Sequence, residues 1–254
     1  MKRILFWTLI WILIPTAICS AQTTLCLPQI ADGQGGGTAW ATAVIISNRA
    51  APGTAVASGT LTFTKDDGTA FNLPLTDERE QVISNTGGVV SFQISGGQTK
   101  LYISTGEVPV ITAGFATITS NLPVAGGAVF FEFNAAGARV AEAGVAAATP
   151  LTQQAIFAVK DNNNTGVAIA NPGTGTASVM FQLLDTTGAT VLTSVTRNVA
   201  AKNHASFFLS ELFPSLQKGF FGTMRITSSL PLVTTALIFE SDGRFATLPV
   251  FPLQ

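Results

Sequence analysis

The chain has 254 residues, of which 47% are hydrophobic and 11% are charged, and its formal net charge is −1. An average globular protein carries about 25% charged residues, so a charge-rich disordered tail and a long charged coiled coil are both excluded. A nucleic-acid-binding protein needs clustered basic residues, whereas the 13 Lys and Arg of this chain are scattered singly among 14 Asp and Glu. The composition excludes these classes but identifies no biochemical activity.

The N-terminus has the three parts of a secretory signal peptide. Met1–Arg3 is basic, Ile4–Ile14 is apolar, and Cys19–Ala21 supplies small residues for cleavage. A membrane-spanning helix needs about 20 apolar residues, and the run here stops earlier, at Pro15. We therefore expect residues 1–21 to be removed on export and the mature chain to begin near Gln22. An uncleaved N-terminal anchor is the alternative.

Cleavage would change both the charge and the cysteine content. Loss of Lys2 and Arg3 moves the net charge from −1 to −3, and only Cys26 remains of the two cysteines. The mature chain then has no intrachain disulfide, although an oxidising compartment would permit one, so its stability must come from core burial. We interpret Cys26 as a small hydrophobic residue near the first strand, with a disulfide between chains or a nucleophile as alternatives.

Alternation of apolar and polar residues with period two predicts β-strands along most of the remaining chain. Leu61 and Phe63 alternate with threonines, Lys65–Gly68 has the composition of a turn, and Phe71–Leu75 resumes the alternation, which predicts a hairpin. Gly, Asn, Asp and Pro separate such runs at about the 8 to 12 residue spacing of all-β sandwiches. Further strands are expected at Val90–Ile94, Leu101–Ile103 and Val129–Phe133.

The second half of the sequence repeats the first. Ile118–Pro123 recurs as Ile226–Pro231, at an offset of 108 residues, and in both copies an apolar strand ending in Glu follows. Upstream, Thr42–Asn48 matches Thr165–Asn171, and a Pro-Gly-Thr sequence follows each of them. Several short matches in the same order predict two tandem copies of one β module.

The boundary between the copies falls in the low-complexity stretch Ala141–Gln154, which is either a linker or a strand that crosses between modules. We predict an all-β fold in which the signal peptide at 1–21 is followed by antiparallel, immunoglobulin-like β-sandwich modules at 22–148 and 149–254. One helical turn is expected at Ser210–Pro214, with Ser210 as its N-cap.

Four features of the chain carry a resemblance to known proteins: Leu27–Gly33 at the mature start, the strand that ends at Asn48, the paired Ile-Thr-Ser-x-Leu-Pro motifs, and Thr247–Val250 near the end. In these features the chain resembles a loose group of exported bacterial proteins with tandem immunoglobulin-like or fibronectin-like β-sandwich modules. The resemblance covers nearly the whole mature chain and implies its architecture. It implies no chemistry, because that group has no catalytic motif to transfer and sandwich folds host many unrelated functions.

No constellation of residues in the sequence points to catalysis, and we expect no enzyme activity and no catalytic residue. His204 is the only histidine, which excludes multi-histidine zinc sites, and its expected place is the surface of a hairpin. A glycosidase would need a carboxylate pair, and the candidates are Asp66/Asp67 in a turn and the cluster Asp77–Glu80. Turn carboxylates usually cap backbone amides, and mixed-charge clusters are usually solvated. Glu132 and Glu240 occupy equivalent positions, which favours an architectural role.

Metal binding has one candidate segment. Asp161–Gly166 gathers oxygen donors before a glycine, as calcium loops do, but Pro172 stands where the EF-hand pattern needs Glu at position 12. Asn-rich loops also form turns without any ion. We expect no metal and no cofactor, with calcium at Asp161–Gly166 as the alternative.

Two functions from different classes fit these features. We expect a non-enzymatic structural or adhesion protein, secreted, periplasmic or at the cell surface, that contacts other surface proteins or copies of itself. The alternative is a carbohydrate-binding module that stacks sugars on exposed aromatics, for which Trp40 and Tyr102 are the candidates. Neither a nucleic-acid partner nor a membrane span in the mature chain is expected.

Overall fold

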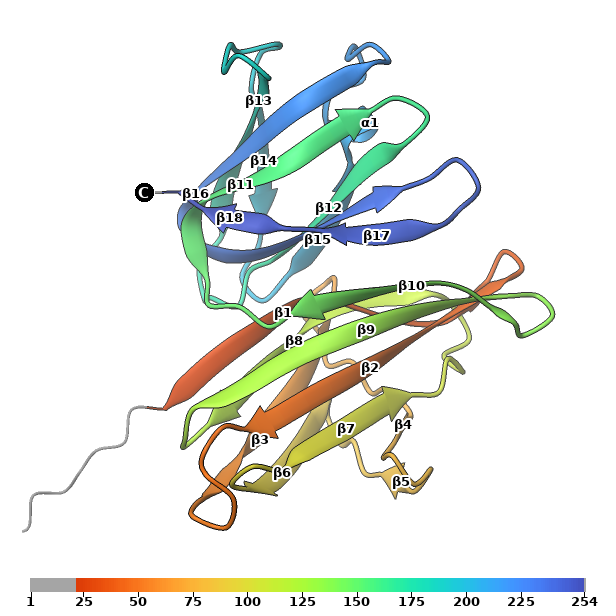
Figure 1. Cartoon of the computed structure of the whole chain (residues 1–254), viewed down its shortest axis with the longest axis vertical. Coiled ribbons are helices and arrows are strands. Elements are labelled where there is room, and N and C mark those ends of the chain that lie inside the picture. Colours follow the sequence, from red (N-terminus) through yellow and green to blue (C-terminus); the bar gives the residue numbers. More distant parts are fainter. Residues whose placement is uncertain (1–21, 254) are drawn as a thin grey trace, which may run out of the picture.

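The computed structural model describes residues 22–253, and the expected signal peptide at 1–21 lies outside them. The described chain is all-β, as predicted, apart from the short helix α1. Its strands form a ten-stranded and an eight-stranded antiparallel sheet, each of which curls toward closure (Figure 1). None of the helical structure in residues 22–253 is long and apolar enough to span a membrane.

The ten-stranded sheet makes up the N-terminal half of the described chain, and the eight-stranded sheet makes up the C-terminal half. The strands of the N-terminal half are β1 (Thr23–Gly35), β2 (Thr38–Asn48), β3 (Val56–Lys65), β4 (Leu75–Thr76), β5 (Val82–Ile83), β6 (Val89–Ser95), β7 (Thr99–Ser104), β8 (Thr112–Ser120), β9 (Val124–Asn134) and β10 (Arg139–Ala146). The elements of the C-terminal half are β11 (Leu151–Lys160), β12 (Asn164–Ala170), β13 (Ala177–Asp185), β14 (Val195–Val199), β15 (His204–Phe208), α1 (Leu209–Leu212), β16 (Phe220–Phe239), β17 (Phe245–Leu248) and β18 (Val250–Pro252).

The N-terminal sheet folds over into two layers that are joined by β1. Thr23–Asp32 of this strand pair with β8, whereas Gly33–Gly35 pair with β2 in the other layer. One layer consists of β1, β8, β3 and β6, and the other of β10, β9, β2, β7, β4 and β5. The alternating apolar residues point between the layers and form one core, which includes Val44, Ile46, Leu61, Phe63, Phe92, Ile118 and Phe130.

The C-terminal half repeats most of these strand pairings, although β4 and β5 have no counterpart in it and β18 has none in the N-terminal half. Strand β16 takes the place of both β8 and β9, because its first part pairs with β11 and β13 and its second part with β12 and β17. The pairs β13–β14 and β12–β15 correspond to β3–β6 and β2–β7. The repeat in the sequence is therefore also a repeat of strand pairing. The stretch Ala141–Gln154 contains the end of β10 and the start of β11.

Two repeated sequence motifs occupy equivalent places in both halves, where the chain leaves a strand or crosses between layers. Asn48 and Asn171 are both buried, and their side-chain amides donate to carbonyl groups of the following segment: Ala55 and Ile94 in the first half, Gly175 and Val199 in the second. The Ile-Thr-Ser-x-Leu-Pro motif lies where the chain crosses from one layer to the other, between β8 and β9 or within β16. The repeated polar residues are thus satisfied hydrogen-bonding groups of the fold.

The predicted hairpin after β3 is correct in its turn and wrong in its second strand. Lys65–Gly68 form the turn, in which the Gly68 N–H donates to the Lys65 carbonyl oxygen (3.0 Å). The Phe71 N–H still donates to the Phe63 carbonyl oxygen (3.1 Å), but beyond Phe71 the chain leaves β3, and Phe71, Leu73 and Leu75 are buried. The Asn85 amide donates to the Phe71 and Leu73 carbonyl groups in place of a strand. The alternation of apolar and polar residues at Phe71–Leu75 therefore comes from a segment that packs over the core and does not pair with β3 as the second strand of a hairpin.

Two equivalent glycines allow neighbouring strands to approach closely. A Cβ atom added to Gly114 in β8 would lie 2.0 Å from the Thr64 carbonyl oxygen, and one added to Gly222 in β16 would lie 2.1 Å from that of Leu184. These distances are far below contact distance, and the blocking atoms belong to the backbone. A side chain at either position would force two paired strands apart.

We expect Gly114→Ala and Gly222→Ala each to lower the free energy of unfolding by about 1–3 kcal/mol, because overpacking at a backbone contact displaces the strands. Gly144→Ala is the matched control, since its added Cβ would lie 3.9 Å from the nearest atom, the Ala128 carbonyl oxygen. Denaturant unfolding measures all three variants. Equal stability of Gly114→Ala and Gly144→Ala would contradict the close approach.

Candidate functional site

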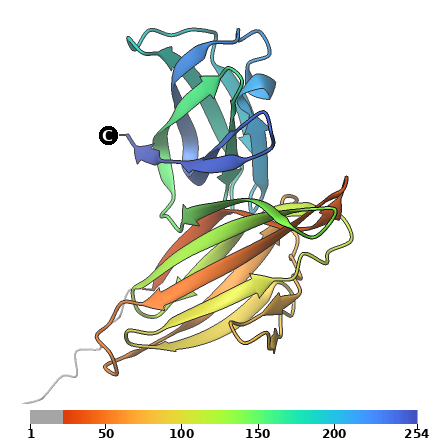
Figure 2. The ribbon, with the colours of Figure 1, turned by 45° about the vertical axis from the view of Figure 1, so that its right-hand side comes forward.

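The two halves are joined by an extensive contact, here called the inter-half interface. The outer side of the layer formed by β15, β12, β16 and β17 lies against β1 and β10 of the N-terminal half (Figures 1 and 2). Cys26 in β1 exchanges two backbone hydrogen bonds, each 2.9 Å, with Ala148 in the segment that joins the halves. Cys26, Phe115, Ala170 and Val233 form a buried apolar cluster beside this pair.

At one end of the interface, an aromatic ring of the C-terminal half enters the core of the N-terminal half. Phe245 in β17 stacks on Trp40 in β2, with ring centroids 5.3 Å apart and an interplanar angle of 13°. Phe245 is buried and belongs to the core cluster of the N-terminal half. The Thr247 hydroxyl donates to the Gly144 carbonyl oxygen (2.5 Å), which ties β17 to β10.

At the other end, His204 meets the turn after β3. Its side chain is 0% exposed, its Nδ1 lies 2.7 Å from Asp66 Oδ1, and its backbone N–H donates to the Asp66 carbonyl oxygen (3.1 Å). The expectation of a surface histidine was therefore wrong, because the sequence does not reveal that this hairpin docks on the other half. The neighbouring Asp67 serves its own turn: hydrogen bonds from the Thr69 hydroxyl and backbone N–H lower the pKa of Asp67.

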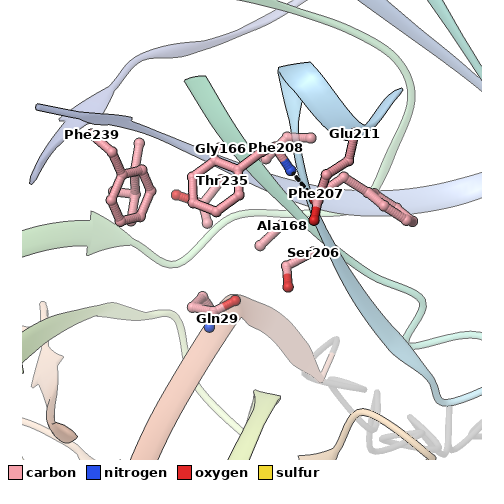
Figure 3. A pocket seen from close by; sticks show the side chains of 11 residues that line it. Gln29, Gly166, Ala168, Ser206, Phe207, Phe208, Glu211, Thr235 and Phe239 are labelled. Atoms are coloured by element: carbon pink, nitrogen blue, oxygen red, sulfur yellow. Dashed lines mark hydrogen bonds between the residues drawn. The ribbon is translucent and has the colours of Figure 1, made fainter. Parts of the chain in front are cut away.

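Between these two ends lies a cavity of about 260 Å³, here called the inter-half cavity (Figure 3). Phe208 of β15 and Phe239 of β16 form an aromatic wall, in which their rings meet edge to face at 5.1 Å. Phe207 also borders the cavity, but its ring packs against Phe181 in the core of the C-terminal half. Gln29 of β1 lies across the cavity from these rings (Figure 3). The other lining residues are Gly166, Val167, Ala168, Ser206, Glu211, Thr235 and Leu237.

Gln29 reaches the cavity because β1 is irregular at this point. The register of β1 against β8 shifts between Leu27 and Ile30, at Pro28, which has no N–H to donate. The Oε1 atom of Gln29 is buried and accepts no hydrogen bond. An unpaired buried acceptor costs free energy that a suitable donor would recover. The sequence signalled this feature only through the proline in a strand.

Glu211 lies at the edge of the cavity and is already partnered. Its carboxylate accepts a hydrogen bond from the Phe208 N–H (2.6 Å), at the start of α1. The predicted helical turn is present, but its N-cap is Phe208, so the assignment of Ser210 as N-cap was wrong. No Lys or Arg is among the residues that line the cavity.

The two aromatic residues expected to be exposed are not open platforms. Tyr102 is 3% exposed and packs in the core of the N-terminal half, and burial raises the pKa of its hydroxyl to about 12. Trp40 is half-buried, and Phe245 covers one face of its ring. The expectation of exposure was wrong at Tyr102 because the ring points inward beside Val44, its partner across the strands.

The other candidate residues of the sequence have local roles. Asp161–Asn163 connect β11 to β12, and Asn164–Gly166 begin β12. There the Asn164 amide donates to the Ser210 hydroxyl, and the Thr165 hydroxyl accepts from the Val159 N–H (both 2.9 Å). Glu132 is half-buried next to Trp40, and burial raises its pKa, whereas Glu240 forms an exposed ion pair with Arg244. Within residues 22–253, no group of three or more His, Cys, Asp or Glu is placed to hold a metal ion.

The C-terminal half also exposes large apolar side chains on its far side, here called the outer phenylalanine face. Phe157, Met180, Phe221 and Phe251 are 40%, 40%, 48% and 53% exposed. They alternate with core residues along β11, β13, β16 and β18, so all four point outward from one layer. The rings of Phe157 and Phe221 lie 6.4 Å apart.

No family model, no curated protein and no solved structure matches the chain. Three features of the structure bear on function: the inter-half interface with its buried His204 and Cys26, the inter-half cavity, and the outer phenylalanine face.

Cys26 reports on whether the interface is closed. Burial raises the pKa of its thiol to about 12, so the reactive thiolate is nearly absent at pH 8 and forms only as the pH approaches that value. We expect alkylation of Cys26 at pH 8 to be about 100-fold slower in the folded protein than in the unfolded chain, or slower still. Mass spectrometry of the Cys26 peptide measures the rate.

Variants at the two ends of the interface should open it. Phe245→Ala removes the ring that stacks on Trp40, at a cost of about 3 kcal/mol, and Asp66→Asn removes the carboxylate that meets His204. Both should accelerate Cys26 alkylation. Asp67→Asn is the matched control, because Asp67 caps only its own turn. Unchanged alkylation in Phe245→Ala would show that the stacked ring does not hold the halves together.

Proposed function

We propose that the chain is an exported, non-enzymatic protein built from two tandem immunoglobulin-like β-sandwich modules, which makes protein–protein contacts outside the cytoplasm. The shared strand pairings of the two halves support the tandem modules. The outer phenylalanine face is the observation that carries the contact function. Soluble proteins rarely leave large apolar side chains grouped on one sheet face unless another molecule covers them.

The composition of this face fits a protein partner. Aromatic residues, Met and Arg are enriched where proteins meet, and Arg225 stands in register between Ala155 and Gln182 on the same side of the sheet. The β18 edge beside Phe251 pairs only with β11 and carries no charged residue. A partner that covers the three rings would bury apolar area around a central arginine.

The state of the reactive groups supports a non-enzymatic role. His204 is enclosed with Asp66 in the inter-half interface, and the Cys26 thiol is buried with a raised pKa. Neither is available as a base or nucleophile for a substrate in solvent. The carbohydrate alternative gains nothing from Tyr102, which is buried, or from Trp40, whose ring already stacks on Phe245.

Export makes a direct prediction about the N-terminus. When the full chain is produced in a bacterial host, the protein outside the cytoplasm should begin near Gln22, because the basic, apolar and small-residue parts of 1–21 direct cleavage there. Intact-mass measurement gives the end. Leu9→Arg, which places a charge in the apolar run, should keep the chain uncleaved inside the cell. An exported protein that retains Met1 would favour the anchor instead.

The contact function is tested by crosslinking in the native envelope. We expect crosslinks from the outer phenylalanine face to a second protein or to another copy of the chain, and the double variant Phe157→Ser/Phe221→Ser should reduce them about tenfold, since buried aromatic contacts dominate interface energy. Val82→Ser is the control, because Val82 is 87% exposed on β5 in the other half. Equal crosslinking in both variants would remove the face as the contact site.

A further inference from the structure

We propose that the inter-half cavity binds an aromatic ring that carries a single hydrogen-bond donor, as in a phenol or an indole. The same chemistry is available from two sources: a small molecule, or the side chain of a Tyr or Trp on a partner. The proposal rests on the cavity and is independent of the outer phenylalanine face.

The size and walls of the cavity suit one aromatic ring. An apolar protein cavity of about 150 Å³ holds benzene, and the inter-half cavity, which is partly open to solvent, has a volume of about 260 Å³. Phe208 and Phe239 already meet edge to face, an arrangement to which a further ring adds favourably. Leu237 extends the apolar lining. A substituted ring would therefore replace water against apolar surface.

Gln29 supplies the polar end of the site. Its Oε1 atom is buried without a donor, and its side chain lies opposite the rings of Phe208 and Phe239 (Figure 3). A ring seated against those two phenylalanines would direct an O–H or N–H substituent toward the amide. The hydrogen bond would satisfy an acceptor that the chain itself leaves unpaired.

The charges exclude other ligand classes. With no Lys or Arg in the lining and one carboxylate, that of Glu211, an anionic ligand would find no countercharge. A sugar would place several hydroxyl groups against the rings of Phe208 and Phe239 and against Leu237, where only Gln29, Ser206, Thr235 and the already bonded Glu211 offer polar side chains, and each unpaired hydroxyl costs free energy on burial. One unpaired acceptor and a mostly apolar wall match a ligand with one donor.

Small residues keep the cavity open. A Cβ atom on Gly166 would lie 2.9 Å from Cε2 of Phe239, so this glycine allows the ring to hold its position. Ala168 lies next to it on the same outward side of β12, in register with Ser206 of β15. A larger side chain at Ala168 would occupy the space that we assign to the ligand.

The test is titration of the purified protein with p-cresol, 3-methylindole, toluene and methyl α-glucoside, followed by ligand-observed NMR. We expect p-cresol and 3-methylindole to bind. Gln29→Leu should weaken p-cresol binding about three- to tenfold and leave toluene binding unchanged or tighter, because only p-cresol loses a hydrogen bond. Ala168→Leu should weaken all three aromatic probes. Cys26 alkylation at the parent rate would show that the variants keep the interface closed.

Four outcomes would overturn the proposal: no binding of either donor-bearing ring at millimolar concentration, an equal effect of Gln29→Leu on p-cresol and toluene, no effect of Ala168→Leu, or competition by methyl α-glucoside. N-acetyltyrosinamide separates the two sources. Binding comparable to that of p-cresol supports a partner side chain, whereas exclusion of the amide with retention of p-cresol supports a small molecule. Val82→Ser, far from the cavity, should leave every titration unchanged.

Discussion

The insertion of Phe245 beneath β2, β9 and β10 is the contact on which the other features depend. Its ring stacks on Trp40 and packs in the same core cluster as Ala141, Ala143 and Val145, so its removal would uncover part of that core. The same docking encloses Cys26 and His204 and creates the cavity between Gln29 and β15. The core of the N-terminal half is therefore completed by Phe245, which lies in the C-terminal half, more than 200 residues after the end of β1.

The two halves share the hydrogen bonds at the ends of β2 and β12 but differ in the residues on the outer sides of these strands. Asn48 and Asn171 make equivalent hydrogen bonds, so the same residue stabilises the same part of the fold in both halves. The outward positions next to these asparagines differ between the halves. Ile45 of β2 corresponds to Ala168 of β12, and of these two residues only Ala168 faces the other half, across the inter-half cavity. Small residues on β12, such as Gly166 and Ala168, allow the close contact with β1.

The sequence patterns correctly predicted those features that depend on residues close together in the chain. Period-two alternation identified strands such as β3, β6 and β9, and the repeated motifs identified the corners, because these depend on neighbours within a few residues. The failures at Phe71–Leu75, Tyr102 and His204 share one cause: their surroundings come from distant segments, such as Asn85, Val44 and Asp66. The cavity was beyond prediction for the same reason, since no single segment contains both Gln29 and its aromatic wall.

The pairing of Cys26 with Ala148 has a mechanical consequence. The segment between β10 and β11 is not a flexible linker. Ala147 is hydrogen-bonded to Gly126, and Ala148 to Cys26. Tension applied to the two ends of the chain must break these bonds and extract Phe245 before the halves can separate. A protein that holds a load between two attachment points gains from this arrangement, since it resists extension as one body instead of yielding at a hinge.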